Sequence, residues 1–389
     1  MYRKIVGLFI FMLLIVTVLP VSGTVDLESN LLPQLFGNIL YVGGSGPGNY
    51  SSIQDAIDNA SDEDTIFVYK GCYESDDNIK INKTIRLIGE DKEDTVIYRN
   101  LIDIVVSNVY ISGFTLLNGS DITIQSTSSI ISNNNKIHDN IFKSNESLYG
   151  MGGISIYNSS NNIVSNNSFF NCGILMDVFD VSCQADSKNN SIYNNTVDDK
   201  PLVYFEYDSD EIIYNAGQII LYHCKNITIN SLEISYTSIG IQLIDCDNCH
   251  ILRCELTNNL LGGMAFNNVS NSSISGNIIK NGALGTTLVN SRNNSILNNS
   301  FENKEINIFL YYSSFNKISH NNFFFKFSYG LWRFKSILSF ESNNKWEGNY
   351  WNRFRLFPVF VWNLYSGYYY QFNKRFDIDW HPAKEPYDI

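Results

Sequence analysis

Apolar and polar positions along this chain follow a pattern that recurs at a nearly constant interval. Its clearest marks are isoleucines that stand three residues after a turn-forming position, usually Asn, and five residues before a second apolar residue. Their positions give a period of about 22 residues, typical of a solenoid whose repeats bury their apolar faces only against one another. The pattern therefore predicts a stack of short parallel strands. These isoleucines are Ile229, Ile251, Ile274, Ile296 and Ile318.

The same template extends over most of the chain and predicts about 11 coils. Parallel strands stacked about 4.8 Å apart bury Ile, Val, Leu and Phe on their inward side. Asn suits the turns, because it tolerates left-handed backbone angles and bonds neighbouring backbone groups. Asn residues repeated at one position are also expected to form ladders of amide hydrogen bonds, so the Asn richness is interpreted as structural. The coils begin at Asn82, Asn108, Asn134, Asn161, Asn189, Asn226, Asn248, Asn271, Asn293, Phe315 and Asn343.

Residues 52–60 have the period of a helix instead. Ser52 can cap its amino end, with Asp55 three residues later. An apolar stripe at i, i+3, i+4 and i+7 follows. We expect this short helix to cover the open amino-terminal end of the stack, since terminal repeats of a solenoid need a cap. The stripe consists of Ile53, Ala56, Ile57 and Ala60.

The carboxy-terminal stretch departs from the repeat and is rich in Phe, Tyr and Trp. We interpret it as an aromatic cap over the other end of the stack, which would otherwise expose apolar surface and unpaired strand edges. A sugar-stacking platform or a partner-binding patch is the alternative.

The amino terminus has the pattern of a targeting segment. Arg3 and Lys4 precede an apolar run over residues 5–21 that ends in small residues. An uncleaved membrane tether is the competing interpretation. The expected organisation is therefore a signal peptide or anchor at 1–23, a linker at 24–39, the solenoid at 40–351 and the cap at 352–389. Within the solenoid, residues 40–81 form the amino-terminal cap and residues 196–214 an inserted excursion.

Charge and composition narrow the class of partner. The formal net charge is −12, so the chain has no excess of basic residues to neutralise nucleic-acid phosphates, and we exclude a nucleic-acid partner. The seven cysteines are an odd number, which leaves at least one thiol unpaired even if export allows disulfides.

Three segments carry a family resemblance: YVGGSGPGNY at 41–50, IQDAI at 53–57 and NNKWEGNYW at 343–351. With the coil pattern, they resemble the NosD-type proteins, which belong to the pectin-lyase-like group with its CASH (carbohydrate-binding and sugar-hydrolase) domains. The resemblance implies an all-β, right-handed parallel β-helix over roughly residues 40–351. It implies less about function, because one fold hosts many activities.

The densest group of ionisable residues lies in the coils from Gly217 to Leu256. Glu233 and Glu255 share one template position, so we expect them to stack on one outer face, with Arg253 nearby. Asp245 and His223 share another column. Two close carboxylates with an Arg can perform acid–base chemistry or hold Ca²⁺. The alternative is a solvated face with ordinary charge pairs, and the same choice applies to Asp177 with Asp180.

Cys246, Cys249 and His250 are soft metal ligands that lie close together in the sequence. NosD-type proteins are linked to the maturation of a copper enzyme, which makes a metal site one hypothesis. Cys224 and Cys246, however, share a template position. This favours a core cysteine ladder or a Cys224–Cys246 disulfide, since buried free cysteines behave as small hydrophobes. His and Met number only 5 each, which does not support a copper-delivery surface.

The sequence thus predicts an exported, monomeric protein, secreted or at the cell surface, with a binding or structural role. Carbohydrate or another cell-envelope component is the expected ligand. A lyase, hydrolase or epimerase acting on polysaccharide is the first alternative, although no catalytic motif of the pectin-lyase-like enzymes is recognisable. A NosD-like maturation factor is the second. No cofactor is expected beyond the Ca²⁺ option.

Overall fold

The computed structural model of the chain describes residues 37–75, 77–144, 153–178, 186–324, 337–340, 342–352, 359–365 and 373–389. The expected targeting segment, including the apolar run at 5–21, lies outside these residues. Among the residues described, no helix is both long enough and apolar enough to cross a membrane. Residues Gly37–Ile389 form one compact unit.

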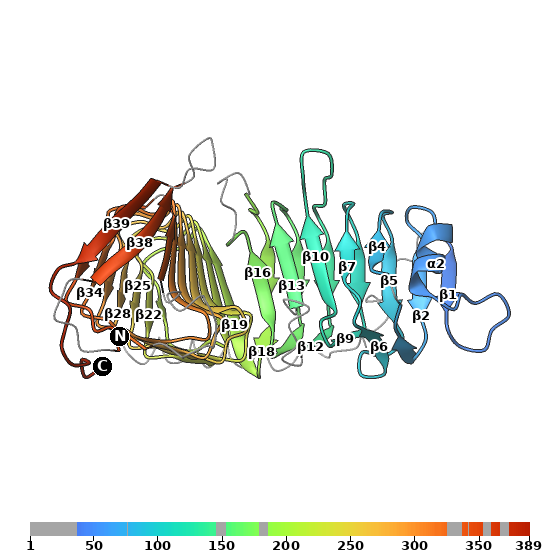
Figure 1. Cartoon of the computed structure of the whole chain (residues 1–389). Coiled ribbons are helices and arrows are strands. Elements are labelled where there is room, and N and C mark those ends of the chain that lie inside the picture. Colours follow the sequence, from blue (N-terminus) through green and yellow to red (C-terminus); the bar gives the residue numbers. More distant parts are fainter. Residues whose placement is uncertain are drawn as a thin grey trace, which may run out of the picture. The chain divides into compact units, whose positions relative to one another are not determined.

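The described residues of this unit form an all-β parallel solenoid of about 12 turns, as the repeat predicts, and a single short helix lies among them. Each regular coil contributes three strands, and equivalent strands pair in parallel with those of the coils before and after (Figure 1). The coils fall into two series, a first segment up to β18 and a second segment from β19 onward.

The first segment contains three sheets. First strands of its coils are β1 (Ile39–Val42), β2 (Thr65–Val68), β5 (Arg86–Gly89), β8 (Tyr110–Ser112), β11 (Lys136–His138), β14 (Ile163–Ser165) and β17 (Ser191–Tyr193). Second strands are β3 (Gly71–Tyr73), β6 (Thr95–Tyr98), β9 (Thr115–Leu117), β12 (Ile141–Lys143), β15 (Ser168–Phe170) and β18 (Thr196–Val197). Third strands are β4 (Ile79–Ile81), β7 (Ile102–Ile104), β10 (Asp121–Gln125), β13 (Gly153–Tyr157) and β16 (Gly173–Met176).

The second segment repeats this arrangement. First strands are β20 (Ile212–Ile213), β22 (Thr228–Asn230), β25 (His250–Leu252), β28 (Ser273–Ser275), β31 (Ser295–Leu297), β34 (Lys317–Ser319) and β37 (Lys345–Glu347). Second strands are β23 (Glu233–Ser235), β26 (Glu255–Thr257), β29 (Ile278–Lys280), β32 (Ser300–Glu302) and β35 (Asn322–Phe323). Third strands are β19 (Lys200–Glu206), β21 (Gln218–Tyr222), β24 (Ile239–Ile244), β27 (Gly262–Asn267), β30 (Leu284–Val289), β33 (Ile306–Tyr311), β36 (Ile337–Phe340) and β38 (Val359–Tyr365). The last strand, β39 (Asn373–Asp379), pairs with β38 in the antiparallel sense.

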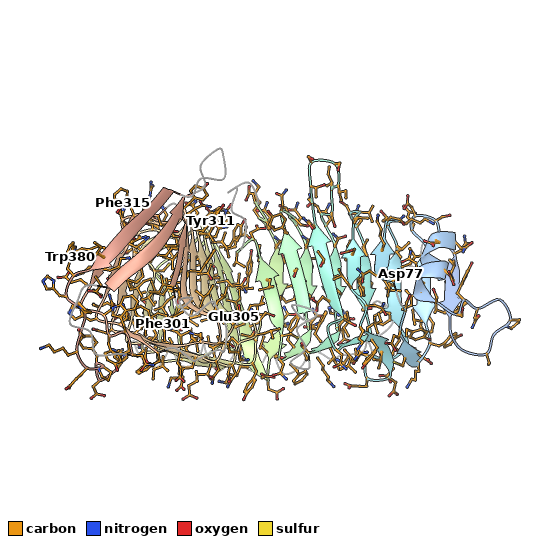
Figure 2. The ribbon with its side chains drawn as sticks, in the orientation of Figure 1. Asp77, Phe301, Glu305, Tyr311, Phe315 and Trp380 are labelled. Carbon is orange, nitrogen blue, oxygen red and sulfur yellow. The ribbon has the colours of Figure 1, made fainter. Side chains whose placement is uncertain are left out.

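The inward column of the second segment contains the predicted isoleucines. Ile229, Ile251, Ile274, Ile296 and Ile318 are register partners in successive coils and are almost fully buried. Stacked phenylalanines such as Phe301 and Phe323 fill the same interior, with ring centroids 5.3 Å apart. Figure 2 labels Phe301 together with two exposed rings, Phe315 and Trp380.

The first predicted coil was aligned two residues too early. Leu87, not Ile85, pairs with Ile111 of the next coil. Both Ile85 and Leu87 are buried, and a slip of two residues keeps side chains on the same face of a strand, so the apolar pattern alone does not fix the register here.

The predicted amide ladders are present, but the template Asn of each coil does not form the buried ones. Template residues such as Asn226 and Asn248 have φ near +52° and occupy the left-handed turn. The ladders use the positions one and six residues later. Asn277 donates through Nδ2 to Oδ1 of Asn299 at 2.9 Å, and Asn299 donates in the same way to Asn321 at 3.0 Å.

The helix α2 (Ile53–Asn59) forms as predicted. Ser52 Oγ accepts a hydrogen bond from the Asp55 backbone N–H at 3.1 Å, which satisfies one of the free donors at the helix start. Ile53, Ala56 and Ile57 are buried in the core of the first segment, so the helix packs against the interior of the stack.

At the carboxy-terminal end of the stack, two carboxylates of β39 accept hydrogen bonds from the last Asn residue of each ladder. Asp379 is fully buried and accepts from Asn349 Nδ2 at 3.0 Å and from Trp351 Nε1 at 3.1 Å. Asp377 accepts from the Asn344 backbone N–H at 3.3 Å. The described part of the cap therefore ends the polar ladders as well as the apolar interior.

The junction between the two segments is a break in the third sheet. β16 is the last strand of its sheet, and side chains of the second segment occupy its free edge. Gln218 accepts from the Ile174 N–H at 2.9 Å and donates to the Ile174 carbonyl at 2.9 Å. Gln242 accepts from the Met176 N–H at 3.2 Å. These side chains take the place of a missing neighbouring strand.

The outer face of the second segment closes the open end of the first segment at this junction. Ile220 and Tyr222 of β21, Ile244 of β24 and Ala265 of β27 all belong to the hydrophobic core of the first segment. The inward residues of the same strands belong to a separate second core. The range 196–214, which the sequence leaves outside the repeat, supplies the connecting strands, because β19 turns back on β18 and then pairs in parallel with β21.

Candidate functional site

A column of outward-facing turn residues runs along the second segment, directly after its third strands. Each residue has a φ between +49° and +61°, so its side chain leaves the coil at the same left-handed bend. Backbone hydrogen bonds tie the bends together, as from His223 N–H to the Ile244 carbonyl at 2.9 Å. We call this set the turn column. It consists of Tyr207, His223, Asp245, Asn268, Asn290 and Tyr312.

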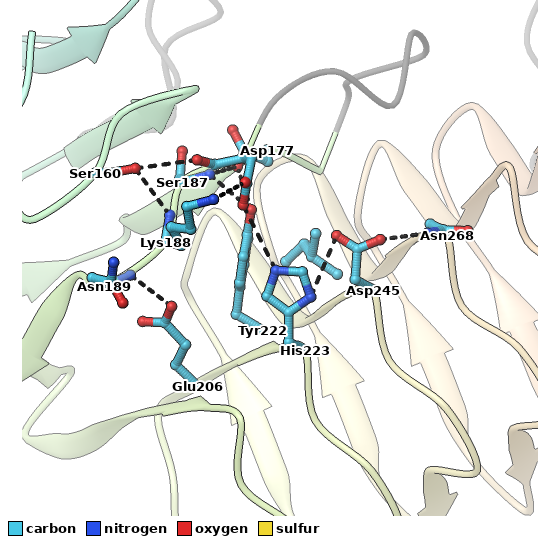
Figure 3. Close-up of polar contacts among 12 residues, drawn as sticks. Ser160, Asp177, Ser187, Lys188, Asn189, Glu206, Tyr222, His223, Asp245 and Asn268 are labelled. Atoms are coloured by element: carbon cyan, nitrogen blue, oxygen red, sulfur yellow. Dashed lines mark hydrogen bonds and ion pairs between the residues drawn. The ribbon is translucent and has the colours of Figure 1, made fainter.

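The start of the turn column combines stacked aromatic rings with charged groups. Figure 3 shows the polar contacts of His223, Asp245 and Asn268. The Tyr207 and His223 rings are stacked, with centroids 4.8 Å apart and planes within 6° of parallel. His223 Nδ1 lies 3.9 Å from Asp245 Oδ2, and its Nε2 lies 3.8 Å from Asp186 Oδ1. Asn268 donates a hydrogen bond to the second carboxylate oxygen of Asp245. Tyr207 is 61% exposed, so the stack presents a ring face to solvent.

A buried pair from the two segments holds this site in place. The Tyr222 hydroxyl donates to Asp177 Oδ2 at 3.0 Å and accepts from the Ser187 N–H at 2.8 Å. Asp177 Oδ1 accepts from the Asn158 N–H at 2.9 Å. Burial raises the pKa of Asp177, and these hydrogen bonds oppose that shift. Burial, with the nearby Asp177 charge, also raises the pKa of Tyr222.

More carboxylates surround the stacked rings. Asp186 forms a 2.6 Å ion pair with Lys188, and this hydrogen bond raises the pKa of the lysine. Glu206 accepts from the Asn189 N–H at 2.6 Å and from the Tyr204 hydroxyl at 2.8 Å. The site therefore offers many hydrogen-bond acceptors and one ammonium group beside an aromatic face. Such a set can bind a hydroxyl-rich ligand.

The acid–base candidates from the sequence occupy two places. Glu233 and Glu255 are register partners on an exposed outer face, as expected from the template. Arg253 Nη2 donates to Asn230 Oδ1 at 2.8 Å, and Lys200 donates to the Glu233 carbonyl at 2.8 Å. Asp245 instead lies in the turn column beside His223. The structure thus brings together only the Asp245–His223 part of that group at the junction.

The metal-ligand candidates point in different directions. Cys246 and Cys249 are inward and buried, whereas the neighbouring His250 is outward, with Nδ1 2.8 Å from Ser273 Oγ. Within the described ranges, no group of three His, Cys, Asp or Glu side chains is arranged to hold a metal ion. The six cysteines described have free thiols, and Cys183 lies outside these ranges.

Sequence reasoning missed several residues of this site, which are Asp186, Lys188, Glu206, Tyr222 and Asn268. It also missed Tyr207, the exposed ring of the stack. Tyr207 lies in the range 196–214, which was not aligned with the coils. The residue that aligns this range with the coils is Asp210, which occupies the same left-handed turn position as the template residue Asn226, with φ values of 63° and 52°. Aligning these two residues places Tyr207 above His223.

Comparison with known proteins identifies the family. The Beta_helix family, described as "Right handed beta helix region", matches residues 65–215 and 217–368, so the chain belongs to this family. The two matches divide close to the structural junction. No curated protein matches.

Solved structures match the chain at low similarity. The A-module of the Azotobacter vinelandii mannuronan C-5 epimerase AlgE4 is 16% identical with a TM-score of 0.28, and the match covers 72% of this chain and 99% of that one. PfbA, a surface adhesin of Streptococcus pneumoniae, is 16% identical with a TM-score of 0.29, over 77% and 81% of the two chains. The alginate lyase AlyF-OU02 is 10% identical with a TM-score of 0.31, over 84% and 88%. At these TM-scores the likeness carries no argument about function.

Proposed function

We propose that this protein is an exported glycan-binding β-helix and that the junction end of the turn column holds the saccharide. The observation that carries the proposal is the exposed Tyr207 ring, stacked on His223 and bordered by Asp245. A sugar ring has an apolar face that packs on an aromatic ring and a rim of hydroxyls that bond to carboxylates and amides. Both kinds of partner lie side by side here.

A polysaccharide is favoured over a single sugar because the turn column continues beyond His223. Asp245 and Asn268 follow in the next two coils, at the spacing of about 4.8 Å between stacked strands. Successive residues of a linear glycan would therefore meet polar side chains on successive coils. The proposal also places the protein outside the cytoplasm, because the apolar segment at 5–21 has the pattern of a targeting segment.

The direct test is binding to a panel of soluble polysaccharides by wild-type protein and the Tyr207→Asn variant. Asn tolerates the left-handed angle at this position, so the fold should persist while the aromatic face is lost. Loss of the apolar contact between the Tyr207 ring and a sugar costs about 1 kcal/mol or more, which corresponds to at least about a fivefold weaker affinity. Tyr236→Asn is the matched control, because Tyr236 is also an exposed tyrosine at positive φ but lies in another column.

Equal weakening by both variants, or by neither, would remove the turn column as the binding site. The location is tested separately, by determining the amino terminus of the protein recovered from the envelope and the medium. A start after residue 23 supports a cleaved signal peptide, and an intact start in the membrane fraction supports a tether.

Acid–base catalysis on polysaccharide is a second candidate function. Its supporting observation is the His223 imidazole between the Asp186 and Asp245 carboxylates, since a positioned His can transfer protons near neutral pH. Under this proposal the wild type releases shorter or unsaturated products from the polysaccharide it binds. His223→Gln then abolishes turnover and retains binding. Binding without any product from the wild type would leave the binding role alone. Ca²⁺ at Glu233 and Glu255 stays a proposal that calorimetric titration can test.

A further inference from the structure

Three thiols gather inside the second segment, directly beneath the turn column. Cys224 follows His223 and Cys246 follows Asp245 in the chain, and Cys249 lies three residues further on. All three are at most 1% exposed. The Asp247 N–H donates to the Cys224 carbonyl at 3.1 Å, which fixes Cys224 and Cys246 at equivalent positions of adjacent coils.

Cys246 is the centre of this group. Its backbone lies opposite that of Cys224, next to the parallel bridge between Lys225 and Asp247, and Cys249 follows it after the left-handed turn at Asn248. All three belong to the second core, and the Cys224 and Cys246 thiols have equivalent orientations, since each bonds to the carbonyl two residues earlier, at 3.4 Å for Tyr222 and 3.3 Å for Ile244. The stacked coils place equivalent Cα atoms about 4.8 Å apart, within the range of about 4.4–6.8 Å that a disulfide spans.

We propose that Cys224, Cys246 and Cys249 form one oxidisable unit, in which Cys246 pairs with either neighbour and the third cysteine stays a thiol. A disulfide oxidant of the glutathione type supplies the chemistry. One cysteine thiolate attacks the oxidant and releases one of its thiols, and the second cysteine attacks the mixed disulfide and releases the other. The two cysteines together lose two electrons and two protons, and the oxidant gains them.

Burial sets the time at which the bond forms. A bulky oxidant does not reach thiols inside a closed stack, so the exchange belongs to folding, before the coils from β21 to β27 close around them. A bond between Cys224 and Cys246 would join two coils, whereas a bond between Cys246 and Cys249 would close one turn. Cys246 cannot form both bonds, which makes the two products mutually exclusive.

The remaining described cysteines have other surroundings. The Cys254 thiol bonds to the Leu252 carbonyl at 3.4 Å, and the Cys172 thiol, in the first segment, bonds to the Phe142 carbonyl at 3.5 Å. Cys72 is exposed. Cys254→Ser is therefore a matched control, because it removes a buried cysteine of the same segment without touching the group.

The experiment refolds the full-length, reduced chain in a mixture of oxidised and reduced glutathione, blocks free thiols and maps disulfide-linked peptides by mass spectrometry. We expect one intramolecular disulfide that always includes Cys246. Cys246→Ser and the double variant Cys224→Ser/Cys249→Ser should lower its yield to the background of refolding without oxidised glutathione. Cys254→Ser and each of the single variants Cys224→Ser and Cys249→Ser should retain a link to Cys246.

Circular dichroism and thermal unfolding establish that each variant has folded before its disulfides are counted. A dominant bond that omits Cys246, a Cys224–Cys249 bond, or no bond in folded wild type after oxidative refolding would overturn the proposal. The outcome is independent of glycan binding, because no ligand enters the measurement.

Discussion

Each buried Asn of the ladders satisfies a large number of backbone groups from a single side chain. Asn299 accepts from the Asn277 N–H and side-chain amide, both at 2.9 Å. It donates to the Ile274 carbonyl at 2.9 Å and to Asn321 Oδ1 at 3.0 Å. In the buried interior of the coil, these bonds satisfy turn groups that no neighbouring strand pairs with, since nearly all buried polar groups need a partner.

Removing one Asn from a ladder should therefore lower the free energy of unfolding more than an ordinary substitution of a buried polar residue. Asn299→Ala leaves the Asn277 amide and the Ile274 carbonyl unpaired, and each unsatisfied group costs about 1–3 kcal/mol. We expect a loss of roughly 2–5 kcal/mol in the free energy of unfolding, measured by urea denaturation. The control is Asn298→Gly, at an exposed left-handed turn residue, which should change stability by less than about 1 kcal/mol. Similar losses for both would mean that turn geometry, not the ladder, sets the cost.

Asp177 makes the stability of the junction dependent on pH. Burial raises its pKa above the value of about 3.9 for an unfolded chain, so the folded protein retains a proton that the unfolded chain releases. Its contribution is complete below about pH 4 and is lost as the pH rises through the raised pKa. Relative to Asp177→Asn, the wild type should therefore lose unfolding free energy as the pH increases from about 4. Unfolding curves at a series of pH values measure this, and a constant difference between the two proteins would contradict it.

At the scale of single elements, β39 determines how the stack ends. Its carboxylates occupy the place where the next Asn of each ladder would stand. They accept hydrogen bonds from the last Asn and have no amide group that would need an acceptor in a further coil. Asp379 also accepts from the Gly348 N–H at 3.0 Å and from the Asn349 N–H at 2.9 Å. A carboxylate suits this place because it accepts only, with room for several donors.

Substitutions of Asp379 should therefore follow an order set by acceptor number. Asp379→Ala leaves the Asn349 and Trp351 donors buried without a partner, and we expect a loss of roughly 3–5 kcal/mol. Asp379→Asn keeps one acceptor oxygen and should lie between the alanine variant and the wild type. Thermal unfolding ranks the three proteins, with hydrogen exchange of β37 as a local measure. An asparagine variant as unstable as the alanine variant would show that charge, rather than acceptor number, is decisive.

The sequence predicts the coils well and the junction poorly, for reasons that particular residues make clear. The isoleucine column and the Asn-rich turns follow from local periodicity, so Ile229 and its equivalents were assigned correctly. The alternation of inward and outward residues does not distinguish Ile85 from Leu87. Gln218 and Gln242 are outward polar residues like many others in the sequence, and only the contact with β16 shows that they are buried. The stack of Tyr207 on His223 depends on the same long-range arrangement, which explains why only His223 and Asp245 were singled out.

At the scale of the whole molecule, the two segments depend on each other unequally. The first core includes Ile244 and Ala265, which the second segment supplies, whereas the second core consists of residues of the second segment alone. The closing surface of the first segment is therefore an outer face of the second. Damage to that face should weaken the first segment more than the second.

Ile244→Asp tests this asymmetry by placing a charge on the buried outer face of β24. We expect amides of β13 and β16 to exchange at least tenfold faster, because a buried unpaired charge costs several kcal/mol. Amides of β31 and β34 should keep their protection. Ile296→Ala, in the second core, is the comparison variant and should first reduce the protection of amides in β31 and β34. Hydrogen exchange read by mass spectrometry distinguishes the two patterns, and equal loss across both segments in both variants would contradict the asymmetry.

The closing of the first segment by the second also has a consequence for biosynthesis. The last strand of the first segment ends at Val197, but Ala265, which helps to cover its open end, follows about 70 residues later. At a synthesis rate of about 5–20 residues per second, roughly 3–14 s pass between the two. During that interval the nascent chain carries a completed stack with an uncovered apolar end. A chaperone or a slow release of the chain would be needed most at this stage, and a stop codon between these positions would yield a product prone to aggregate.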